Sequence, residues 1–510
     1  LLVKQNDGLH TLVWTLHHIL IDGWSIYHII NDLVASFEND KAIKGFHREK
    51  SLQFHHLNRW LNAQNPDNAL TFWKEQLTPI QNITPFPFTK TKDQPSPDKP
   101  IENQEEHCLL CSSDITSKIK NLAKQYHVTL NSLFQFSWAK MLQLLTDNDT
   151  ISFGVTVSGR NHDFQGIERI VGPLINTLPV VTQWSNQLTI KEQVQIIHKT
   201  FQQINQYSHI DLNELLKMTE LTTPHLFNHI LVFENHKKVA TYQNNSGDIQ
   251  IENIEEIEKT NYPITVLGSE ENDSLQVKVI YDTDCFDEEM IHKMLITLEE
   301  ILEYTLENPT AKTNQIQTTS LRLDLDASKP KKSNNAVSQK IIESKEKQTN
   351  LIVEKDQRSL LYITLWKKIL GQECITLNDD FFYLGGHSLN ALEISNELKQ
   401  KGELVSVNDI YQYRTIENLL SSVYNKAYTE EQTDRKAIKN HENLFPLSPL
   451  QQRFIKRKLV NRNRFNVPFL AKIKFKTSIN AINEVVKALV EKHKSLQLRF
   501  VKEDGNFKQY

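Results

Sequence analysis

The sequence predicts a multidomain protein: a domain of strands and helices first, a helical domain second, and a further segment after a second linker. Three observations predict this order. The 510 residues leave room for about three domains. Two polar stretches, 316–355 and 429–442, have the composition of linkers. The apolar pattern is strand followed by helix in residues 1–315, and helical in residues 356–428.

Composition is that of a globular protein and favours no charged partner. Hydrophobic residues make up 39 % and charged residues 24 %, and the formal net charge is only −4. No apolar run approaches the length needed to cross a bilayer, so we expect no membrane partner. The chain begins Leu1-Leu2-Val3, without a Met or a signal-peptide pattern, and is expected to be a slice of a longer protein.

The four cysteines are too few for a disulfide framework, which predicts a reducing, cytoplasmic location. His107, Cys108 and Cys111 have the spacing of metal ligands, but no second cysteine pair follows them. We therefore predict no metal site there, and expect an alternating strand with two buried thiols instead.

Residues 9–18 alternate between two faces and predict a strand. His17 and His18 point in opposite directions if this strand runs through both, so they cannot both serve one pocket. A histidine pair is often only a structural or surface feature, and we interpret His55-His56 in that way.

Asp22-Gly23 predicts a turn after this strand, and Ser25 is placed to cap the helix that follows. The strand, tight turn and helix place a histidine at the end of a rigid element, which is a favourable position for chemistry. The apolar stripe of the helix consists of Ile26, Ile29, Ile30, Leu33, Val34 and Phe37.

The segment from His17 to Gly23 reads HHxxxDG, and it resembles the active-site pattern of condensation domains of nonribosomal peptide synthetases. Three later stretches resemble the same family: 155–160 a strand ending in a Gly-Arg turn, 170–179 its VGxxINTLP segment, and 226–235 its late strand. This resemblance implies that residues 1–315 are most of one condensation domain, a two-lobed α/β fold like that of chloramphenicol acetyltransferase.

The resemblance also implies roles for the motif residues. His18 would lie in a tunnel between the two lobes and assist the attack of an amine on a thioester, either by removing a proton or by positioning the amine. His17 would be structural. Asp22 would hold the loop by a salt bridge, and Gly23 would permit close approach of the substrate. Because the family's two upstream motifs are missing, we expect Asp22's arginine partner to be absent from this sequence.

The first linker contains a basic cluster at 328–335, but no aromatic residues interleave it, so we predict a solvated linker and no nucleic-acid partner. About fifty residues cannot contain the adenylation domain that an elongation module of this family holds here, and no ATP-binding Gly-rich motif is present. The resemblance therefore implies that an adenylation domain acts in trans or lies elsewhere in the parent protein.

Residues 379–389 combine an apolar turn, two glycines and a serine that opens a helix. Gly385 and Gly386 leave the approach free of side chains. Ser388 in the first helical turn is exposed, and a helix N-terminus favours an attached anion. On local features alone, a plain serine N-cap after a Gly-rich turn is the favoured interpretation.

The run DDFFYLGGHSLNAL resembles the core of peptidyl carrier domains of the same synthetases. Residues 365–371 resemble the family's first helix, with Gly371 as its stop, and residues 409–416 resemble its third helix and the start of its fourth. Residues 356–428 would thus be a four-helix carrier domain. The resemblance implies that a phosphopantetheinyl transferase attaches 4′-phosphopantetheine to Ser388, within the motif formed by Gly385, Gly386, His387 and Leu389.

Residues 443–510 open with SPLQQRF, which resembles the first motif of a condensation domain. Residues 491–500 resemble the second motif imperfectly, because Lys492 and Gln497 stand where the family has arginines. This segment is therefore predicted to begin a second condensation domain.

The resemblance as a whole implies a fragment of a nonribosomal peptide synthetase that forms an amide bond between carrier-tethered thioesters. Its partners would be upstream and downstream carrier and condensation domains. Three alternatives stay open: an epimerisation domain, which shares HHxxxDG; ester formation or acyl transfer to a free amine by the same histidine; and a non-catalytic scaffold or docking segment.

Overall fold

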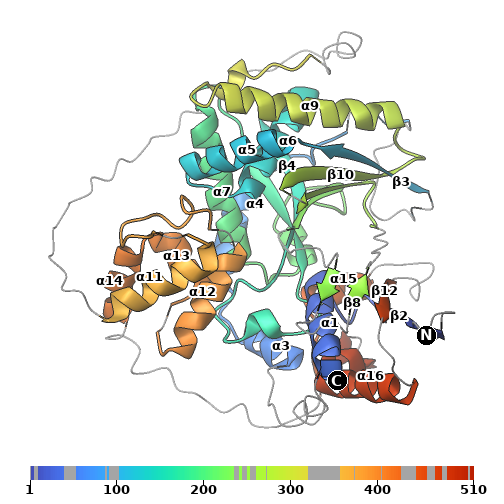
Figure 1. The fold of residues 1–510 in the computed structure, drawn as a ribbon. Coiled ribbons are helices and arrows are strands. Elements are labelled where there is room, and N and C mark those ends of the chain that lie inside the picture. Colours follow the sequence, from blue (N-terminus) through green and yellow to red (C-terminus); the bar gives the residue numbers. More distant parts are fainter. Residues whose placement is uncertain are drawn as a thin grey trace.

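The computed structural model describes most of the chain, and all structural statements concern the described residues (Figure 1). These are residues 2–4, 10–38, 53–86, 89–90, 101, 103–234, 241–243, 250–252, 260–271, 273–319, 357–372, 374–386, 388–403, 405–426, 444–456, 466–473, 479–503 and 506–510.

The larger lobe is built on a six-stranded mixed sheet with the order β3-β10-β9-β6-β4-β5. The β9–β6 and β6–β4 pairs are parallel and the others antiparallel. The strand β4 is buried on both faces, and its sequence alternates apolar residues with small residues such as Ser152 and Gly154. The strands are β3 (Gln104–Leu110), β4 (Thr150–Val157), β5 (Asn176–Gln183), β6 (His229–Glu234), β9 (Ile264–Glu271) and β10 (Ser274–Asp282).

Four long helices cover this sheet (Figure 1). Polar side chains set where three of them begin, because Ser112, Thr129 and Thr189 each accept a hydrogen bond from a backbone N–H in the first helical turn. The helices are α5 (Ser113–Tyr126), α6 (Leu130–Thr146), α7 (Ile190–Gln206) and α9 (Glu288–Glu307). Shorter elements of this lobe are α4 (Asp67–Leu77), α8 (Leu212–Lys217), η1 (Ile167–Arg169) and η2 (Thr313–Gln315).

The smaller lobe combines elements from the two ends of the chain (Figure 1). From the first end come β1 (Leu2–Lys4), β2 (His10–His17), α1 (Gly23–Glu38) and α3 (Phe54–Asn62). From the last end come β11 (Phe445–Pro446), α15 (Pro449–Lys456), β12 (Asn466–Ile473), α16 (Ile479–Lys492), η4 (Lys494–Gln497), β13 (Phe500–Glu503) and β14 (Asn506–Gln509). A separate two-stranded sheet pairs β7 (Thr241–Gln243) with β8 (Gln250–Glu252).

The described part of residues 443–510 therefore does not stand apart from residues 1–315. It forms its own three-stranded sheet, β11-β14-β13, but β12 joins β2 and α16 packs on α1. The physical reason is apolar burial, because Ile482, Val485 and Leu489 on α16 share one hydrophobic cluster with residues of β2 and α1.

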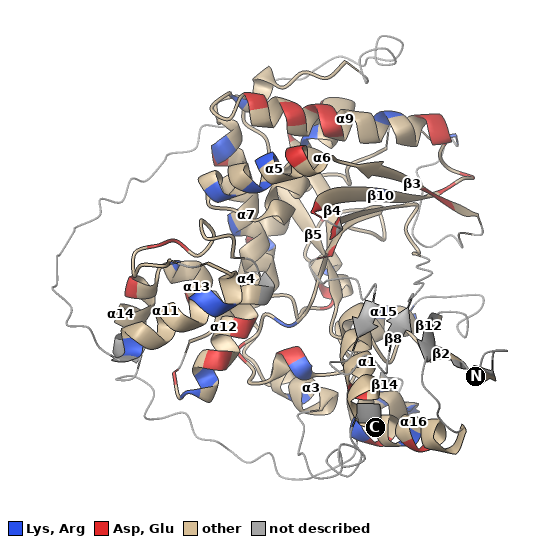
Figure 2. Ribbon diagram, viewed as in Figure 1, with Lys and Arg blue, Asp and Glu red and all other residues tan. Residues whose placement is uncertain are grey.

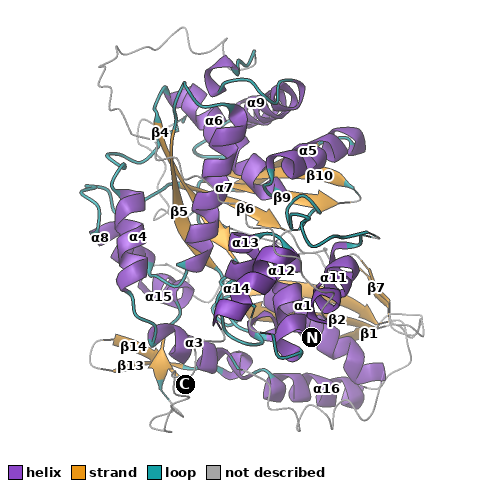
Figure 3. Cartoon of the chain, turned by 90° about the vertical axis from the view of Figure 1, so that its left-hand side faces the viewer, coloured by secondary structure: helices purple, strands orange, loops and turns teal. Residues whose placement is uncertain are grey.

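The predicted four-helix domain is confirmed. Its helices are α11 (Gln357–Leu370), α12 (Ser388–Gln400), α13 (Val407–Tyr413) and α14 (Ile416–Lys426), which Figure 3 shows grouped together. Gly371 ends α11 at φ +64°, and the Thr415 hydroxyl caps α14 by accepting a hydrogen bond from Asn418 N (3.2 Å). The apolar stripe of α12 is buried at Leu392, Ile394 and Leu398.

This helical domain packs against α5 and α7 of the larger lobe. The ring of Phe382 meets the His198 ring edge-on at 4.9 Å, and Arg414 Nη2 donates to the His127 carbonyl (3.2 Å). Arg414 also pairs with Asp380 (2.8 Å), which lies 3.4 Å from the His127 ring. The contact between the helical domain and the larger lobe therefore includes Asp380 and Phe382, which lie just before the LGGHS sequence.

The cysteine prediction is partly wrong. Cys108 is exposed on β3, while Cys111 follows the strand and is buried. Burial, with the nearby charges of Glu299 and Glu303, raises the pKa of the Cys111 thiol to about 11, so this thiol is unreactive at neutral pH. Within the described ranges, no group of three potential ligands is arranged to hold a metal ion.

Figure 2 shows basic and acidic residues scattered over several helices, without a single basic face in that view. Acidic residues gather on α9. None of the helices in the described part of the chain is both long and apolar enough to cross a membrane.

Candidate functional site

The two histidines of HHxxxDG lie where β2 runs into a tight turn. β2 ends at His17, and His18 is already in the turn that leads to α1. The alternation of strand residues therefore stops one residue before His18, and the turn decides where its imidazole lies. Both rings are partly buried.

The His18 ring is held in one tautomer. Its Nδ1 lies 2.9 Å from the backbone oxygen of Ile21. A carbonyl oxygen can only accept a hydrogen bond, so Nδ1 carries the hydrogen and donates it. In the neutral ring, the other nitrogen, Nε2, then bears a lone pair. An imidazole fixed in this way can accept a proton, or a hydrogen bond from an amine, at Nε2.

His17 is part of the turn's scaffold. Its Nδ1 accepts a hydrogen bond from Ile19 N (3.1 Å), and its ring meets the Phe454 ring edge-on at 5.2 Å. Because one nitrogen accepts from the backbone and the ring packs on an aromatic side chain, the geometry gives His17 a structural task.

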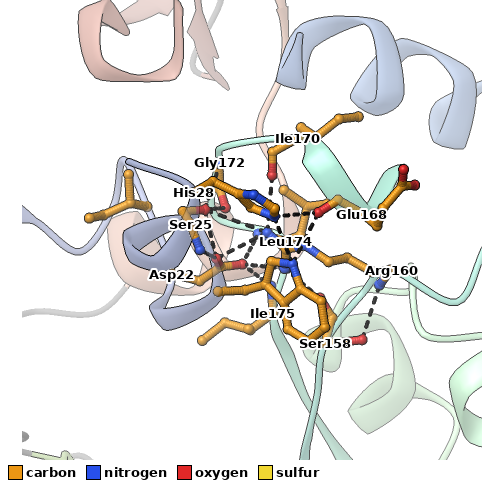
Figure 4. A network of polar contacts seen from close by, with 12 residues as sticks. Asp22, Ser25, His28, Ser158, Arg160, Glu168, Ile170, Gly172, Leu174 and Ile175 are labelled. Atoms are coloured by element: carbon orange, nitrogen blue, oxygen red, sulfur yellow. Dashed lines mark hydrogen bonds and ion pairs between the residues drawn. The ribbon is translucent and has the colours of Figure 1, made fainter. Parts of the chain in front are cut away.

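Asp22 is fully buried and caps α1 (Figure 4). Its carboxylate accepts hydrogen bonds from Ser25 N (2.9 Å) and Ser25 Oγ (2.7 Å). It also accepts from the backbone of the 170–179 segment, at Leu174 N (3.0 Å) and Ile175 N (3.3 Å). The prediction that Ser25 caps the helix is therefore wrong: Ser25 lies inside α1, and Asp22 is the cap because its carboxylate accepts from the third helical N–H.

Asp22 does have an arginine partner, which contradicts the expectation from the sequence. Arg160 Nη1 and Nη2 lie 2.8 Å and 3.1 Å from the two carboxylate oxygens, and both side chains are completely buried (Figure 4). Arg160 also donates to the carbonyls of Ser158 and Ile170, each at 3.1 Å. The expectation failed because the arginine comes from the Gly-Arg turn 138 residues downstream, not from an upstream motif.

Gly159 makes this pairing possible. Its φ is +65°, and a Cβ there would collide with the Leu174 carbonyl oxygen. Only glycine adopts this conformation at low cost while allowing that approach. The turn after β4 can therefore deliver Arg160 to the base of the histidine turn.

Replacing Gly159 with alanine is expected to destabilise the larger lobe by about 1–3 kcal/mol, because both the backbone conformation and the Leu174 contact become strained. Thermal unfolding compared with a Gly23→Ala variant would measure this, since a Cβ at Gly23 meets nothing within 4 Å. Equal melting temperatures for the two variants would contradict the conclusion that position 159 requires glycine.

Opposing effects act on the Asp22 carboxyl, and the net effect lowers its pKa. Burial raises the pKa, whereas the charge and hydrogen bonds of Arg160 and the hydrogen bonds of Ser25 lower it by more. Asp22 is thus ionised at neutral pH. The stability that it contributes is present above its ordinary pKa and is lost as the pH falls through the lowered value.

Sequence reasoning missed Trp24 and His28, which extend this network. Trp24 Nε1 donates to the Glu168 carbonyl (3.0 Å) and lies 3.1 Å from His28 Nε2, and its ring stacks over Arg160 at 5.4 Å. Burial and the Arg160 charge lower the pKa of His28 to about 4, so it is neutral. The sequence signal for this contact was their spacing of four residues, which places both side chains on the same face of α1.

The surroundings of Gly23 leave room beside the turn, since nothing beyond its chain neighbours and its own helix backbone lies within 4 Å of where its Cβ would be. A small pocket opens nearby at the seam of the lobes, and Gly159 and Leu174 belong to both the pocket and the Asp22 network. The pocket is lined by Phe54, Leu57, Asn58, Leu61, Gly159, His162, Pro173, Leu174, Ser208, His209, Ser448 and Pro449.

The second candidate site is the loop before α12. Gly385 has φ +88°, and a Cβ on Gly386 would come within 2.5 Å of the Phe381 ring, so both positions require glycine. Asp380 stiffens the loop by accepting from Phe382 N (2.9 Å) and Tyr383 N (3.0 Å). α12 begins at Ser388, as predicted. His387 and the side chains of Ser388 and Leu389 lie outside what the structure describes.

Comparison with known families decides what these two sites belong to. The family described as "Condensation domain" matches residues 1–324, and the family described as "Phosphopantetheine attachment site" matches residues 363–423. This chain belongs to the condensation-domain family. The carrier domain that follows the condensation domain is a site of 4′-phosphopantetheine attachment, and the predicted resemblance to both families is confirmed.

Relatives of the condensation domain occur in large peptide synthases. Bacitracin synthase 1 of Bacillus licheniformis is 28 % identical over 313 residues, and tyrocidine synthase 2 of Brevibacillus parabrevis is 30 % identical over 321 residues. These matches cover 59 % and 62 % of this chain, but only 6 % and 9 % of the two synthases. The chain thus spans a small fraction of the length of the relatives it matches.

Among solved structures, the X-domain from teicoplanin biosynthesis in complex with OxyB is similar, with a TM-score of 0.47 and 18 % identity. The match covers 59 % of this chain and 68 % of that one.

Proposed function

We propose that the condensation domain forms an amide bond between two acyl groups carried as thioesters, as part of a nonribosomal peptide synthetase. The observation that carries this proposal is the fixed tautomer of His18, in a turn that the buried Asp22–Arg160 pair holds in place. The condensation and carrier domains in one chain support it, because the second domain would bring one of the two thioesters to the first.

In the proposed reaction, the amine nitrogen of one substrate attacks the thioester carbonyl of the other. A C–N bond forms, the C–S bond breaks, and the thiol of the donor's arm is released. The amine loses one proton, which His18 Nε2 accepts and returns to the departing sulfur. A neutral imidazole held in one orientation suits this step, and a ring that mainly positions the amine would use the same nitrogen.

Ser388 is the proposed attachment residue for the arm. α12 begins there, and the backbone N–H groups and positive end of a helix stabilise a phosphodiester. The two constrained glycines and the Asp380 hydrogen bonds would hold the approach in one shape for a phosphopantetheinyl transferase.

A single arm is expected when the protein is incubated with coenzyme A and a broad-specificity phosphopantetheinyl transferase. Intact-mass measurement should show one added phosphopantetheine in the native sequence and none in Ser388→Ala. Ser421→Ala, an exposed serine on α14 of the same domain, should keep the full mass gain and is the matched control. An undiminished gain in Ser388→Ala would overturn the assignment.

For the chain as a whole we propose five segments. They are a condensation domain (1–315), a linker (316–355), a carrier domain (356–428), a second linker (429–442), and the opening of a second condensation domain (443–510). An adenylation domain acting in trans or elsewhere in the parent would load the carrier. Further carrier and condensation domains would be its partners, in the cytoplasm.

A further inference from the structure

Contacts on α7 and on the loop before η1 fix the carrier domain on the larger lobe. The Phe382 ring meets the His198 ring edge-on, and burial lowers the pKa of this histidine to about 3, so a neutral ring packs there. The His198 ring is itself held, because its Nδ1 lies 2.8 Å from Ser132 Oγ. In the last turn of α12, Lys399 forms an ion pair with Asp163. The loop before α12 is therefore held against the larger lobe.

The charged groups where α5 meets this loop differ in how they are paired. Asp380 forms an ion pair with Arg414 (2.8 Å) and lies 3.4 Å from the His127 ring. Lys124 lies in the last turn of α5 and is half-buried. Its ammonium makes no hydrogen bond or ion pair with any residue that the structure describes. A half-buried cation without an anionic partner is thus available at the edge of the contact.

Lys124 lies directly beside the loop that leads to Ser388. A Cβ built on Gly385 would lie 3.3 Å from Lys124 Cε and 3.7 Å from its Nζ. Ser388 follows Gly385 by three residues, and a backbone of that length spans at most about 11 Å. The lysine stem is flexible and its three N–H donors can turn, so the ammonium can reach a group attached to the serine.

The arm of a carrier domain supplies the missing anion. 4′-Phosphopantetheine is joined to a serine through a phosphodiester, which carries one negative charge at neutral pH. We propose that Lys124 of the condensation domain binds this phosphodiester on Ser388. The α5–α7 face would then hold the modified carrier domain more tightly than the unmodified one. The inference rests on the proposed attachment at Ser388, and it adds a binding residue from the other domain.

The expected strength follows from the exposure of the pair. Lys124 is only half-buried, so solvent and salt screen its attraction to the phosphate in part. A charge-assisted hydrogen bond in such surroundings should favour the docked arrangement by about threefold to tenfold. The preference should shrink as the salt concentration rises.

Phosphorus NMR of the full chain tests the contact itself. The chain is modified with coenzyme A and a phosphopantetheinyl transferase, and the phosphodiester signal is recorded at low salt. We expect Lys124→Gln to shift and narrow this signal, because the phosphate then moves freely with the arm. Lys124→Arg, which keeps the charge, should retain most of the native shift and width. A signal that is identical in the native sequence and in Lys124→Gln would overturn the proposal.

Lys118 offers a matched control on the same helix. Its side chain is exposed and pairs with Asp114 one turn away (2.7 Å). Lys118→Gln removes the same charge from α5 and should leave the phosphorus signal as in the native sequence. An equal change in Lys118→Gln and Lys124→Gln would mean that the signal reports the overall charge of α5, and it would contradict a direct contact.

Hydrogen exchange measures the effect on docking. Amides of residues 120–130 and 379–386 should exchange about threefold to tenfold more slowly in the modified chain than in the unmodified one. Lys124→Gln should remove this difference. Asp163→Asn, which acts on the contact but not on the phosphate, should speed exchange while keeping the difference. Equal exchange in modified and unmodified native chains would overturn the proposed preference.

The position of the arm is verified by fragmentation mass spectrometry before either measurement. An arm found on a residue other than Ser388 would overturn the attachment proposal and this inference together. An arm on Ser388 whose phosphorus signal and exchange do not depend on Lys124 would overturn this inference alone.

Discussion

Replacing Arg160 with leucine is expected to lower the free energy of unfolding of the condensation domain by about 3–5 kcal/mol. The substitution leaves the Asp22 carboxylate buried with its charge uncompensated, since both members of the pair are completely inaccessible. Thermal unfolding followed by far-UV circular dichroism, at neutral pH, measures the loss. Arg160→Lys should recover only part of the lost stability, because an ammonium has no planar pair of N–H donors to match the two carboxylate oxygens as the guanidinium does.

A double substitution separates the pair from simple loss of packing. Asp22→Asn with Arg160→Leu removes both charges, so its destabilisation should be clearly less than the sum of the two single effects. Additive losses would contradict the pairing as the cause.

The pH dependence of Arg160→Leu has a definite sign. Without the arginine, burial is the largest remaining effect on the Asp22 carboxyl, so we expect its pKa in the folded variant to rise above the unfolded value. Stability of the variant is then favoured below the unfolded pKa and is lost as the pH rises through the raised folded value. The stability of the native sequence is expected to change with pH in the opposite direction. The melting temperatures of the native protein and of Arg160→Leu should therefore lie closer together in acid than at neutral pH.

His18→Ala is expected to slow amide-bond formation by about 10²–10⁴-fold, roughly 3–5 kcal/mol of activation free energy. The reason is the loss of the Nε2 lone pair that the Ile21 hydrogen bond fixes in place. The assay loads Ser388 with a chemically prepared aminoacyl-pantetheine, adds an acyl thioester donor, and follows the product by mass spectrometry.

His17→Ala is the matched control. The His17 ring is a hydrogen-bonded part of the turn, so its loss should lower the free energy of unfolding by about 1–3 kcal/mol. The rate of amide-bond formation should fall much less than in His18→Ala. If His18→Ala forms product at the native rate with unchanged thermal stability, the assignment of His18 is wrong.

Features set by local sequence were predictable. The helices of the carrier domain follow from apolar periodicity and from caps such as Thr415 and Gly371, because those signals act within one or two turns. The turn after His17 and the glycines before Ser388 are visible for the same reason.

Features set by tertiary contacts were not predictable. Arg160 was noticed as part of a turn, but nothing local says that Gly159 bends the chain so that this arginine reaches Asp22. Likewise, the motif at 443–510 predicts the opening of a domain, but it does not reveal that α16 covers α1, since an apolar face fits any complementary surface. Cys108 is exposed because it lies on β3 at the edge of the sheet.

The most direct test of the proposed condensation is the mass of the group on Ser388 after the reaction. The chain carrying an aminoacyl-pantetheine is supplied with an acyl thioester donor, and the arm is released and fragmented in the mass spectrometer. We predict that the arm gains the donor's acyl group, joined to the amino nitrogen, in the native sequence. An arm that keeps only its original aminoacyl group would contradict the account and favour a scaffold or docking role.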